Sequence, residues 1–175
     1  MDMNTFYKAI LIPGLQWAAN LTHIENSRYM SFDAQRMLLA IMKQESNLEH
    51  RFQVLDYKTL KAGAARGWGQ HEQGNISLLM KHSVAEPMLR QLTQAASVQW
   101  DAAAIWRAME GHDNLSVGIS RILLWTDPGK LPTDENAAWD CYAERVWKPG
   151  KPNREKWVTS WREANKTVQQ AFSGS

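Results

Sequence analysis

Apolar residues along this chain recur at steps of three and four positions, which is the period of an amphipathic α-helix. The spacing predicts helices over residues 4–11, 13–20, 31–45, 75–82, 83–96, 101–110, 115–125, 136–147 and 155–172. In the last of these, one apolar stripe is formed by Trp157, Trp161, Ala164, Val168 and Phe172. We therefore expect a mainly α fold.

Residues that favour helix ends support several of these boundaries. Ser31 precedes the helix that ends at Glu45, and a serine there can accept a hydrogen bond from the first turn. Ser83 and Glu86 have the spacing of a capping box. Pro13 stands where helices often begin, since proline has no N–H to donate. The pattern thus predicts that a helix starts at each of these three points.

The helical period is lost between residues 49 and 74. Glycines fall in this segment at positions 63, 67, 69 and 74. A long glycine-containing connection inside a helical domain is more often functional than a simple link. Alternatively, Phe52 to Leu55 form one strand of a short β-hairpin. Around residues 50–74 we therefore expect either an irregular functional loop or a hairpin.

The composition fits a single domain spanning residues 1–175. With 44% hydrophobic and 22% charged residues the mixture is ordinary for a folded protein, and no repeat or linker divides it. The net charge of +2 gives no reason to expect a nucleic-acid partner. The single cysteine, Cys141, excludes an internal disulfide, which fits either a protein made in a reducing compartment or one that is stable without disulfides.

The sequence predicts neither a membrane span nor a signal peptide. No apolar run approaches the roughly 20 residues that a membrane-spanning helix needs. The N-terminal stretch from Ala9 to Leu15 is short, it is broken by Pro13 and Gly14, and only Lys8 provides positive charge before it.

Glu45 lies on the apolar face of its predicted helix, in line with Ala34, Leu38 and Ile41. A carboxylate in that position is costly unless it is paired or has a chemical use. Partial burial and the negative end of the helix dipole both raise the pKa of such a group, as a general acid for glycosidic-bond cleavage requires. The alternative is a buried structural glutamate that is hydrogen-bonded to a neighbouring helix. The spacing alone leaves both interpretations open.

Four short motifs follow one another in the order found in lytic transglycosylases and the related goose-type lysozymes. Glu45-Ser46 resembles the Glu-Ser motif of that family, and residues 67–70 (Gly-Trp-Gly-Gln) resemble its Gly-Leu-Met-Gln motif with the middle two residues replaced. Residues 114–119 are similar to its Asn-x-x-x-Gly helix. Tyr142 stands where the family has Ala-Tyr-Asn, here without the Asn. Segments 123–128 and 147–152 look like parts of phage-encoded virion proteins of this type.

The resemblance implies a lysozyme-like α fold that cleaves the β-1,4 bond between N-acetylmuramic acid and N-acetylglucosamine in peptidoglycan, with Glu45 as the single essential acid and base. It also implies a phage particle component, made in the host cytoplasm, that acts on the periplasmic cell wall and has other virion proteins as partners. A hydrolytic lysozyme (an endolysin) would need a second carboxylate, for which we expect Glu72 rather than Asp56. The remaining alternatives are a catalytically silent virion protein and a cell-wall binding module, each of the same fold.

Five further residues are candidates for substrate contact. The resemblance implies that Tyr142 hydrogen-bonds the catalytic acid. Ser46 either orients that acid or bonds its own backbone, and Gln70 either binds the glycan or fixes the loop around it. Trp68 is expected to stack on a sugar ring. Gly67 either lets the backbone approach a sugar or serves only the turn.

The sequence gives no reason to expect a metal or another cofactor. His71-Glu72 begins a zinc-protease pattern, but Asn75 stands where the second histidine is required. The remaining histidines have no ligand-like spacing, and one cysteine cannot form a structural zinc site.

A cluster of basic residues surrounds a Pro-Gly turn near the C-terminal end. Its members are Lys148, Lys151, Arg154 and Lys156. Such a cluster either meets phosphate or peptide carboxylates of a cell wall or forms a solvated face.

Overall fold

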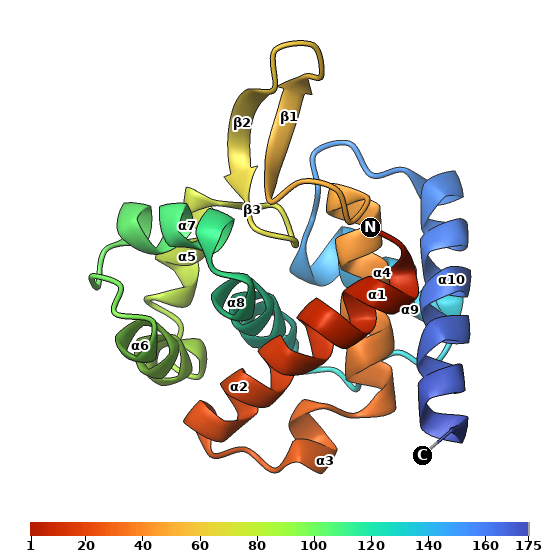
Figure 1. The fold of residues 1–175 in the computed structure, drawn as a ribbon. Coiled ribbons are helices and arrows are strands. Elements are labelled where there is room, and N and C mark those ends of the chain that lie inside the picture. Colours follow the sequence, from red (N-terminus) through yellow and green to blue (C-terminus); the bar gives the residue numbers. More distant parts are fainter. Residues whose placement is uncertain (175) are drawn as a thin grey trace.

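The computed structural model describes residues 1–174 and has a mainly helical fold with a small antiparallel sheet, which confirms the mainly α prediction (Figure 1). The helices are α1 (Met3–Phe6), α2 (Ile12–Thr22), α3 (Asn26–Tyr29), α4 (Phe32–Ser46), α5 (Gln73–Leu79), α6 (Ala85–Ala95), α7 (Ala102–Gly111), α8 (Asp113–Trp125), α9 (Glu135–Asp140) and α10 (Arg154–Ser173). Two π-helical segments are η1 (Tyr7–Leu11) and η2 (Cys141–Val146), and the strands are β1 (Phe52–Asp56), β2 (Lys61–Arg66) and β3 (His71–Glu72).

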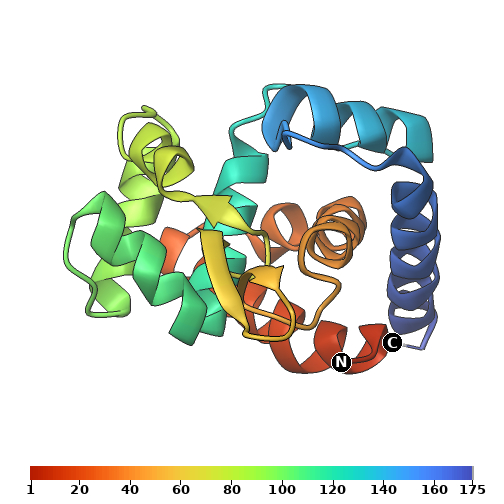
Figure 2. The ribbon, with the colours of Figure 1, turned by 90° about the horizontal axis from the view of Figure 1, so that it is seen from above.

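The predicted irregular segment contains the sheet, whose strands follow one another in the order β1-β2-β3. All neighbours are antiparallel, with Phe52 opposite Arg66 and Ala65 opposite Glu72. The hairpin of β1 and β2 stands away from the helices in Figure 1. Seen from above, the sheet lies between α5 to α7 on one side and α4 with α10 on the other (Figure 2). Of the two expectations for residues 50–74, the hairpin is therefore confirmed.

Helix α4 is the centre of the core, because every residue from Ala34 to Met42 is buried. It packs along α10, whose stripe of Trp157, Trp161, Ala164 and Val168 is buried as predicted. The prediction is wrong for Phe172. This ring meets Phe32 edge-on at the end of the helix pair and remains 49% exposed, because no further element covers it there.

The first three elements run on as one helix rather than forming two. The N–H of Ile12 bonds the carbonyl of Tyr7, five residues back, which makes η1 a wider π-turn. Pro13 follows directly, and in a regular α-turn its ring would collide with the carbonyl of residue 9. The wider turn relieves that collision. The predicted helix start at Pro13 is therefore wrong, and the proline is accommodated inside the helix.

The predicted helix cap is confirmed for α4 and wrong for α6. Ser31 Oγ accepts a hydrogen bond from the N–H of Ala34, so α4 begins as expected. At α6 the cap is not Ser83. His82 Nδ1 accepts from the N–H groups of Val84 and Ala85 instead, and α6 begins at Ala85. Within residues 1–174, no helix is both long and apolar enough to cross a bilayer.

Candidate active site

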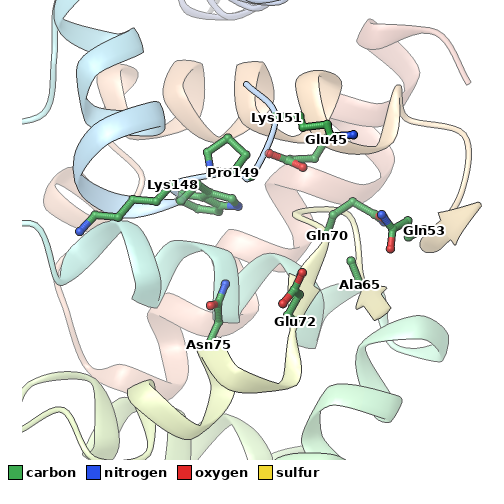
Figure 3. Close-up of a pocket in the computed structure, with 11 residues that line it drawn as sticks. Glu45, Gln53, Ala65, Gln70, Glu72, Asn75, Lys148, Pro149 and Lys151 are labelled. Atoms are coloured by element: carbon green, nitrogen blue, oxygen red, sulfur yellow. The ribbon is translucent and has the colours of Figure 1, made fainter. Parts of the chain in front are cut away.

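The last turn of α4 carries Glu45 into a cleft with a volume of about 530 Å³. One side of this cleft comes from the sheet region and α5, through Gln53, Ala65, Gln70, Glu72 and Asn75. The other side is the segment that follows η2, residues 147–151. Figure 3 shows Glu45 and Glu72 on opposite sides, with both carboxyl groups directed into the cleft. Residues about a hundred positions apart in the sequence therefore share one concave site.

A second hollow continues the cleft beyond Glu45. It shares Glu45, Gln53 and Gln70 with the first hollow, so these three side chains stand where the two meet. Its other walls include the rings of His50, Phe52 and Tyr57, and the ammonium of Lys156. The ring centres of Phe52 and Tyr57 lie 5.8 and 6.0 Å from that of His50. The combined groove thus has an aromatic arm and a polar arm, with Glu45 at the junction.

The carboxyl group of Glu45 is partly buried, and burial raises its pKa above the ordinary value. Two neighbours act in the opposite direction. Tyr142 donates its hydroxyl proton to Oε1 of Glu45 over 2.6 Å, and the positive charge of Lys156 favours the carboxylate. Burial is the largest of these effects, so the site favours the protonated form of Glu45. Tyr142 and Lys156 remain available to stabilise the ionised form once the proton has left.

Tyr142 is held in place by aromatic packing. Its ring stacks on that of Trp157 of α10, with centres 4.8 Å apart and planes 5° from parallel, and it is only 2% exposed. Burial and the neighbouring carboxylate of Glu45 raise the pKa of Tyr142, so it remains a donor throughout the working range. The structure therefore places Tyr142 where the resemblance implied, beside the acid.

Lys156 was predicted only as part of a basic cluster, and its charge interaction with Glu45 was missed. It lies in the first turn of α10, and its ammonium donates to the carbonyl of Gln44, one residue before the acid. Burial lowers the pKa of Lys156, while the charge of Glu45 raises it. No sequence spacing relates positions 45 and 156, and only the packing of α4 on α10 brings them together.

The two candidates for a second carboxylate differ sharply in position. Glu72 is exposed, belongs to β3 and lines the cleft that contains Glu45. Asp56 ends β1 and is used in the turn that follows, where it accepts from the backbone N–H of Lys58 and the hydroxyl of Thr59. Of the two, Glu72 is the residue that the structure brings into the cleft.

Gln70 both lines the cleft and fixes its own loop. Its side-chain amide donates to the carbonyl of Gly67 over 2.8 Å, and its backbone has a positive φ of 51°. The loop-fixing alternative is thus present in the structure. Because that bond uses one of the two N–H groups of the amide, the Oε1 atom and the second N–H of Gln70 remain for a ligand.

The expectation that Trp68 stacks on a sugar is wrong, because the ring is 1% exposed. Its indole N–H donates to Asp113, its backbone N–H to Ser116 Oγ, and its ring meets Phe6 edge-on. The indole ring therefore packs in the hydrophobic core, and its one polar group, the N–H, has a hydrogen-bond partner there.

Gly67 approaches α8 rather than the cleft. Its φ is +72°, and a Cβ there would come within 2.5 Å of Ser116 Oγ. Gly69 is also close to α8, since a Cβ would come within 2.6 Å of Ser120 Oγ. These glycines let the loop pack onto the helix, so the turn alternative for Gly67 holds and the approach to a sugar does not.

Ser46 bonds its own backbone, as its structural alternative required. Its hydroxyl donates to the carbonyl of Met42 and accepts from the N–H of Leu48. The structure shows no bond from it to Glu45, so the orienting role falls to Tyr142 instead.

The cleft residues that sequence reasoning missed lie on both sides of Glu45. They are Asn47, His50, Phe52, Gln53, Val54, Tyr57, Ala65, Asn75, Trp147, Pro149 and Gly150. Trp147 is anchored by an indole N–H bond to the carbonyl of Gly69 over 2.9 Å. The Lys-Pro-Gly-Lys-Pro run was the one available signal for part of this set, since proline and glycine mark a loop that passes over the surface.

Among residues 1–174, no three His, Cys, Asp or Glu side chains gather in a way that could hold a metal ion. Comparison of the chain with protein-family models, with curated proteins and with solved structures found no match. The chemistry of the cleft is therefore the basis on which a function is assigned.

Proposed function

We propose that this protein cleaves the β-1,4 glycosidic bond between N-acetylmuramic acid and N-acetylglucosamine in peptidoglycan, as a lytic transglycosylase with Glu45 as general acid and base. One observation carries the proposal: a carboxyl group whose pKa burial raises sits at the junction of a long open groove and accepts a hydrogen bond from Tyr142. The motifs around Glu45, Gln70 and Tyr142 resemble those of that family.

The proposed reaction needs only one protein carboxyl group. The proton of Glu45 passes to the glycosidic oxygen as the bond from that oxygen to the muramoyl C1 breaks. The muramoyl 6-hydroxyl oxygen then bonds to C1, and its proton returns to the carboxylate of Glu45. Tyr142 and Lys156 stabilise the carboxylate that exists between these two proton transfers. The product carries a 1,6-anhydro ring and the enzyme returns to its starting protonation state.

A hydrolytic lysozyme is the second candidate, and the position of Glu72 favours it. This carboxyl group faces Glu45 across the same cleft, where it could activate water or support an oxocarbenium ion. The two reactions differ in product, since hydrolysis leaves a reducing end where transglycosylation leaves an anhydro ring.

The lysozyme-like fold and the setting are part of the same proposal. A helical body with a small antiparallel sheet beside the acid suits the proposed fold. The assignment to a phage particle that opens the host cell wall is supported by the resemblance of residues 123–128 and 147–152 to virion proteins.

Mass spectrometry of peptidoglycan digests tests the proposal. Wild-type protein is expected to release muropeptides with 1,6-anhydro ends, and Glu45→Gln protein is expected to release none. Reducing ends alone would favour the lysozyme reaction. A folded wild-type protein that releases neither product would contradict both and favour the catalytically silent alternative.

A further inference from the structure

A separate hollow with a volume of about 400 Å³ lies at the opposite end of α4 from the candidate active site. Ser31, which caps the first turn of α4, lines this hollow, whereas Glu45 lies in the last turn of the same helix. At 1.5 Å per residue these two ends are roughly 20 Å apart. We call the hollow the arginine pocket, and its walls include Arg28, Ser31, Arg121, Leu124, Trp125 and Leu131.

Arg121 of α8 is buried in the wall of the arginine pocket without a counter-charge. Its side chain is 1% exposed, and among residues 1–174 it has no carboxylate partner. Its Nε donates to the carbonyl of Tyr29 over 2.8 Å, and its Nη2 donates to that of Arg28 over 3.3 Å. A buried guanidinium that lacks an anionic partner is costly, so this position favours a ligand that provides negative charge.

The Nη1 atom of Arg121 is the part that remains for such a ligand. Within the described residues it donates to no group, yet it is not among the polar side-chain atoms that are sealed from solvent without a partner. Burial lowers the pKa of Arg121 to about 10, so the side chain still carries its charge at neutral pH. A charged donor therefore reaches the arginine pocket from its buried wall.

Two further donors of the arginine pocket are also unused. Arg28 is exposed, and in the part of the chain that the structure describes its side chain makes no hydrogen bond or ion pair. Ser31 Oγ accepts from the N–H of Ala34, but its own proton has no acceptor among those residues. The guanidinium carbons of Arg28 and Arg121 lie 5.7 and 4.6 Å from the ring centre of Trp125. Donors from α3, from the start of α4 and from α8 thus surround one hollow.

Asp127, a carboxylate that lines the arginine pocket, is already used. Its Oδ2 accepts from Nε and Nη2 of Arg145 over 3.1 and 2.9 Å, and its Oδ1 accepts from the N–H of Gly129 over 3.1 Å. Because Arg145 balances the charge of Asp127, the charges of Arg28 and Arg121 remain uncompensated. A concave site with such an excess of one sign raises the local concentration of ligands of the opposite sign.

We propose that the arginine pocket binds the phosphate group of an organic phosphate through Arg28, Ser31 and Arg121. The Nε–Nη2 edge of Arg121 holds backbone carbonyls, so it is not free to grip a planar carboxylate with two parallel bonds. Single donors on three separate elements suit the tetrahedral oxygens of a phosphate instead, and its charge of about −2 matches the two arginines.

The apolar walls indicate what the phosphate is attached to. A phosphate ion fills only part of a hollow of about 400 Å³, and Leu124, Trp125 and Leu131 leave apolar surface beside the donors. We therefore expect an organic group next to the phosphate. The inference does not depend on the proposed cleavage at Glu45, because the two sites are at opposite ends of α4.

Titration calorimetry at low ionic strength tests the inference with phenyl phosphate, inorganic phosphate and benzoate. Phenyl phosphate is expected to bind roughly tenfold tighter than inorganic phosphate, because its ring covers part of the apolar wall. It is also expected to bind tighter than benzoate, which has the ring but a smaller charge.

Ser31→Asp is the decisive variant, because aspartate also caps helices but places a negative charge at the arginine pocket. Its affinity for phenyl phosphate should fall at least about tenfold. Ser31→Thr retains both the cap and the hydroxyl group and should bind like wild type. Arg121 itself is not replaced, since its bonds to two carbonyls hold the end of α3 and its loss could unfold the protein.

Arg28→Gln tests the exposed arginine. It should weaken the binding of phenyl phosphate by roughly two- to fivefold, because the charge is partly screened by solvent. The matched control is Arg107→Gln, which removes the same charge from an exposed arginine of α7 outside the arginine pocket and should leave the affinity unchanged.

Sedimentation with phosphatidylglycerol vesicles, compared with phosphatidylcholine vesicles, identifies the source of the phosphate. Binding to the former alone, abolished by Ser31→Asp, would assign the arginine pocket to a lipid headgroup. Binding of phenyl phosphate without sedimentation would assign it to a free phosphate ester. The inference is overturned if none of the probes binds, if benzoate binds as tightly as phenyl phosphate, if folded Ser31→Asp protein binds like wild type, or if Arg107→Gln weakens binding as much as Arg28→Gln.

Discussion

The hydroxyl of Tyr142 donates to Oε1 of Glu45 over 2.6 Å, although the two residues are 97 positions apart in the sequence. The bond directs one carboxyl oxygen toward the protein and leaves the other for the cleft. It also stabilises the ionised form of the acid, against the burial that disfavours it.

Replacing Tyr142 by Phe is expected to raise the pKa of Glu45, because the hydrogen bond that lowers it is lost. Since the acid must be protonated to act, the alkaline limb of the pH–rate profile should move to higher pH. The maximum kcat should fall roughly tenfold, because the carboxyl group is no longer oriented. Muralytic rates measured between pH 4 and 9 check both effects, and an alkaline limb that moves to lower pH would contradict the assignment.

The variant Lys156→Met separates the effect of a nearby positive charge on Glu45 from the effect of its orientation by Tyr142. Loss of the positive charge should also raise the pKa of Glu45 and move the alkaline limb upward, while the bond from Tyr142 remains. Lys43→Met is the matched control, because Lys43 is in the last turn of α4 but does not line the groove. An equal shift in both variants would show a general charge effect rather than a local one.

Glu45→Gln should reduce cleavage at least about 100-fold, as expected for loss of a general acid. It should also stabilise the protein at high pH. A carboxyl group whose pKa is raised on folding favours the folded state at low pH, and this contribution is lost as the pH rises through its folded value. The melting temperature of the variant should therefore exceed that of wild type at pH 8, and the difference should shrink at pH 4. A lower melting temperature at pH 8 would contradict this account.

Glu72→Gln distinguishes the two candidate reactions. A transglycosylase should keep activity within roughly tenfold of wild type and still form anhydro ends, because the nucleophile belongs to the substrate. The same variant of a hydrolase should lose about 100-fold or more. Asp56→Asn is the companion variant, since this carboxylate only closes the turn after β1.

His71 predicts a loss of stability in acid. It is fully buried, and burial lowers its pKa from 6.5 to about 4. Between these two pH values the unfolded chain binds a proton that the folded chain excludes, so the free energy of unfolding should fall as the pH drops from 6.5 to 4. The full effect is about 3 kcal/mol. Urea unfolding at pH 7 and 4.5 should show a smaller difference for His71→Asn than for wild type, and equal differences would refute the assignment.

The spacing of apolar residues predicted most of the helices, because each helix buries one face against the core. Burial of one face leaves apolar residues at every third or fourth position of the sequence. The predicted stripe of α10 from Trp157 to Val168 is an example. The cap of α6 could not be predicted from a serine alone, because the neighbouring ring of His82 accepts from the N–H groups of Val84 and Ala85 at the start of the helix. Pro13 misled for a similar reason, since a π-turn can hold a proline that an α-turn rejects.

For the candidate site, the sequence singled out Glu45, which the structure places in a cleft, but it misassigned some of its neighbours. Glu45 could be found because a carboxyl group on an apolar face breaks a local pattern. Trp68 was expected to stack on a sugar, and only its burial and its bonds to Asp113 and Ser116 show that it belongs to the core. The contact of Lys156 with the end of α4 depends on how two distant helices pack, which no local spacing records.

The π-turn of η2 has a consequence for how the groove tolerates change. In this wide turn the N–H of Trp147 donates to the carbonyl of Tyr142. The hydroxyl of Tyr142 bonds Glu45, and the indole of Trp147, one turn later, bonds the carbonyl of Gly69. Deleting a single residue between them would restore a regular α-turn and rotate the two rings out of step. The length of this turn is therefore expected to matter more than its exposed side chains: an apolar residue in place of the exposed Glu144 should be harmless, whereas a one-residue deletion should abolish the proposed cleavage without unfolding the protein.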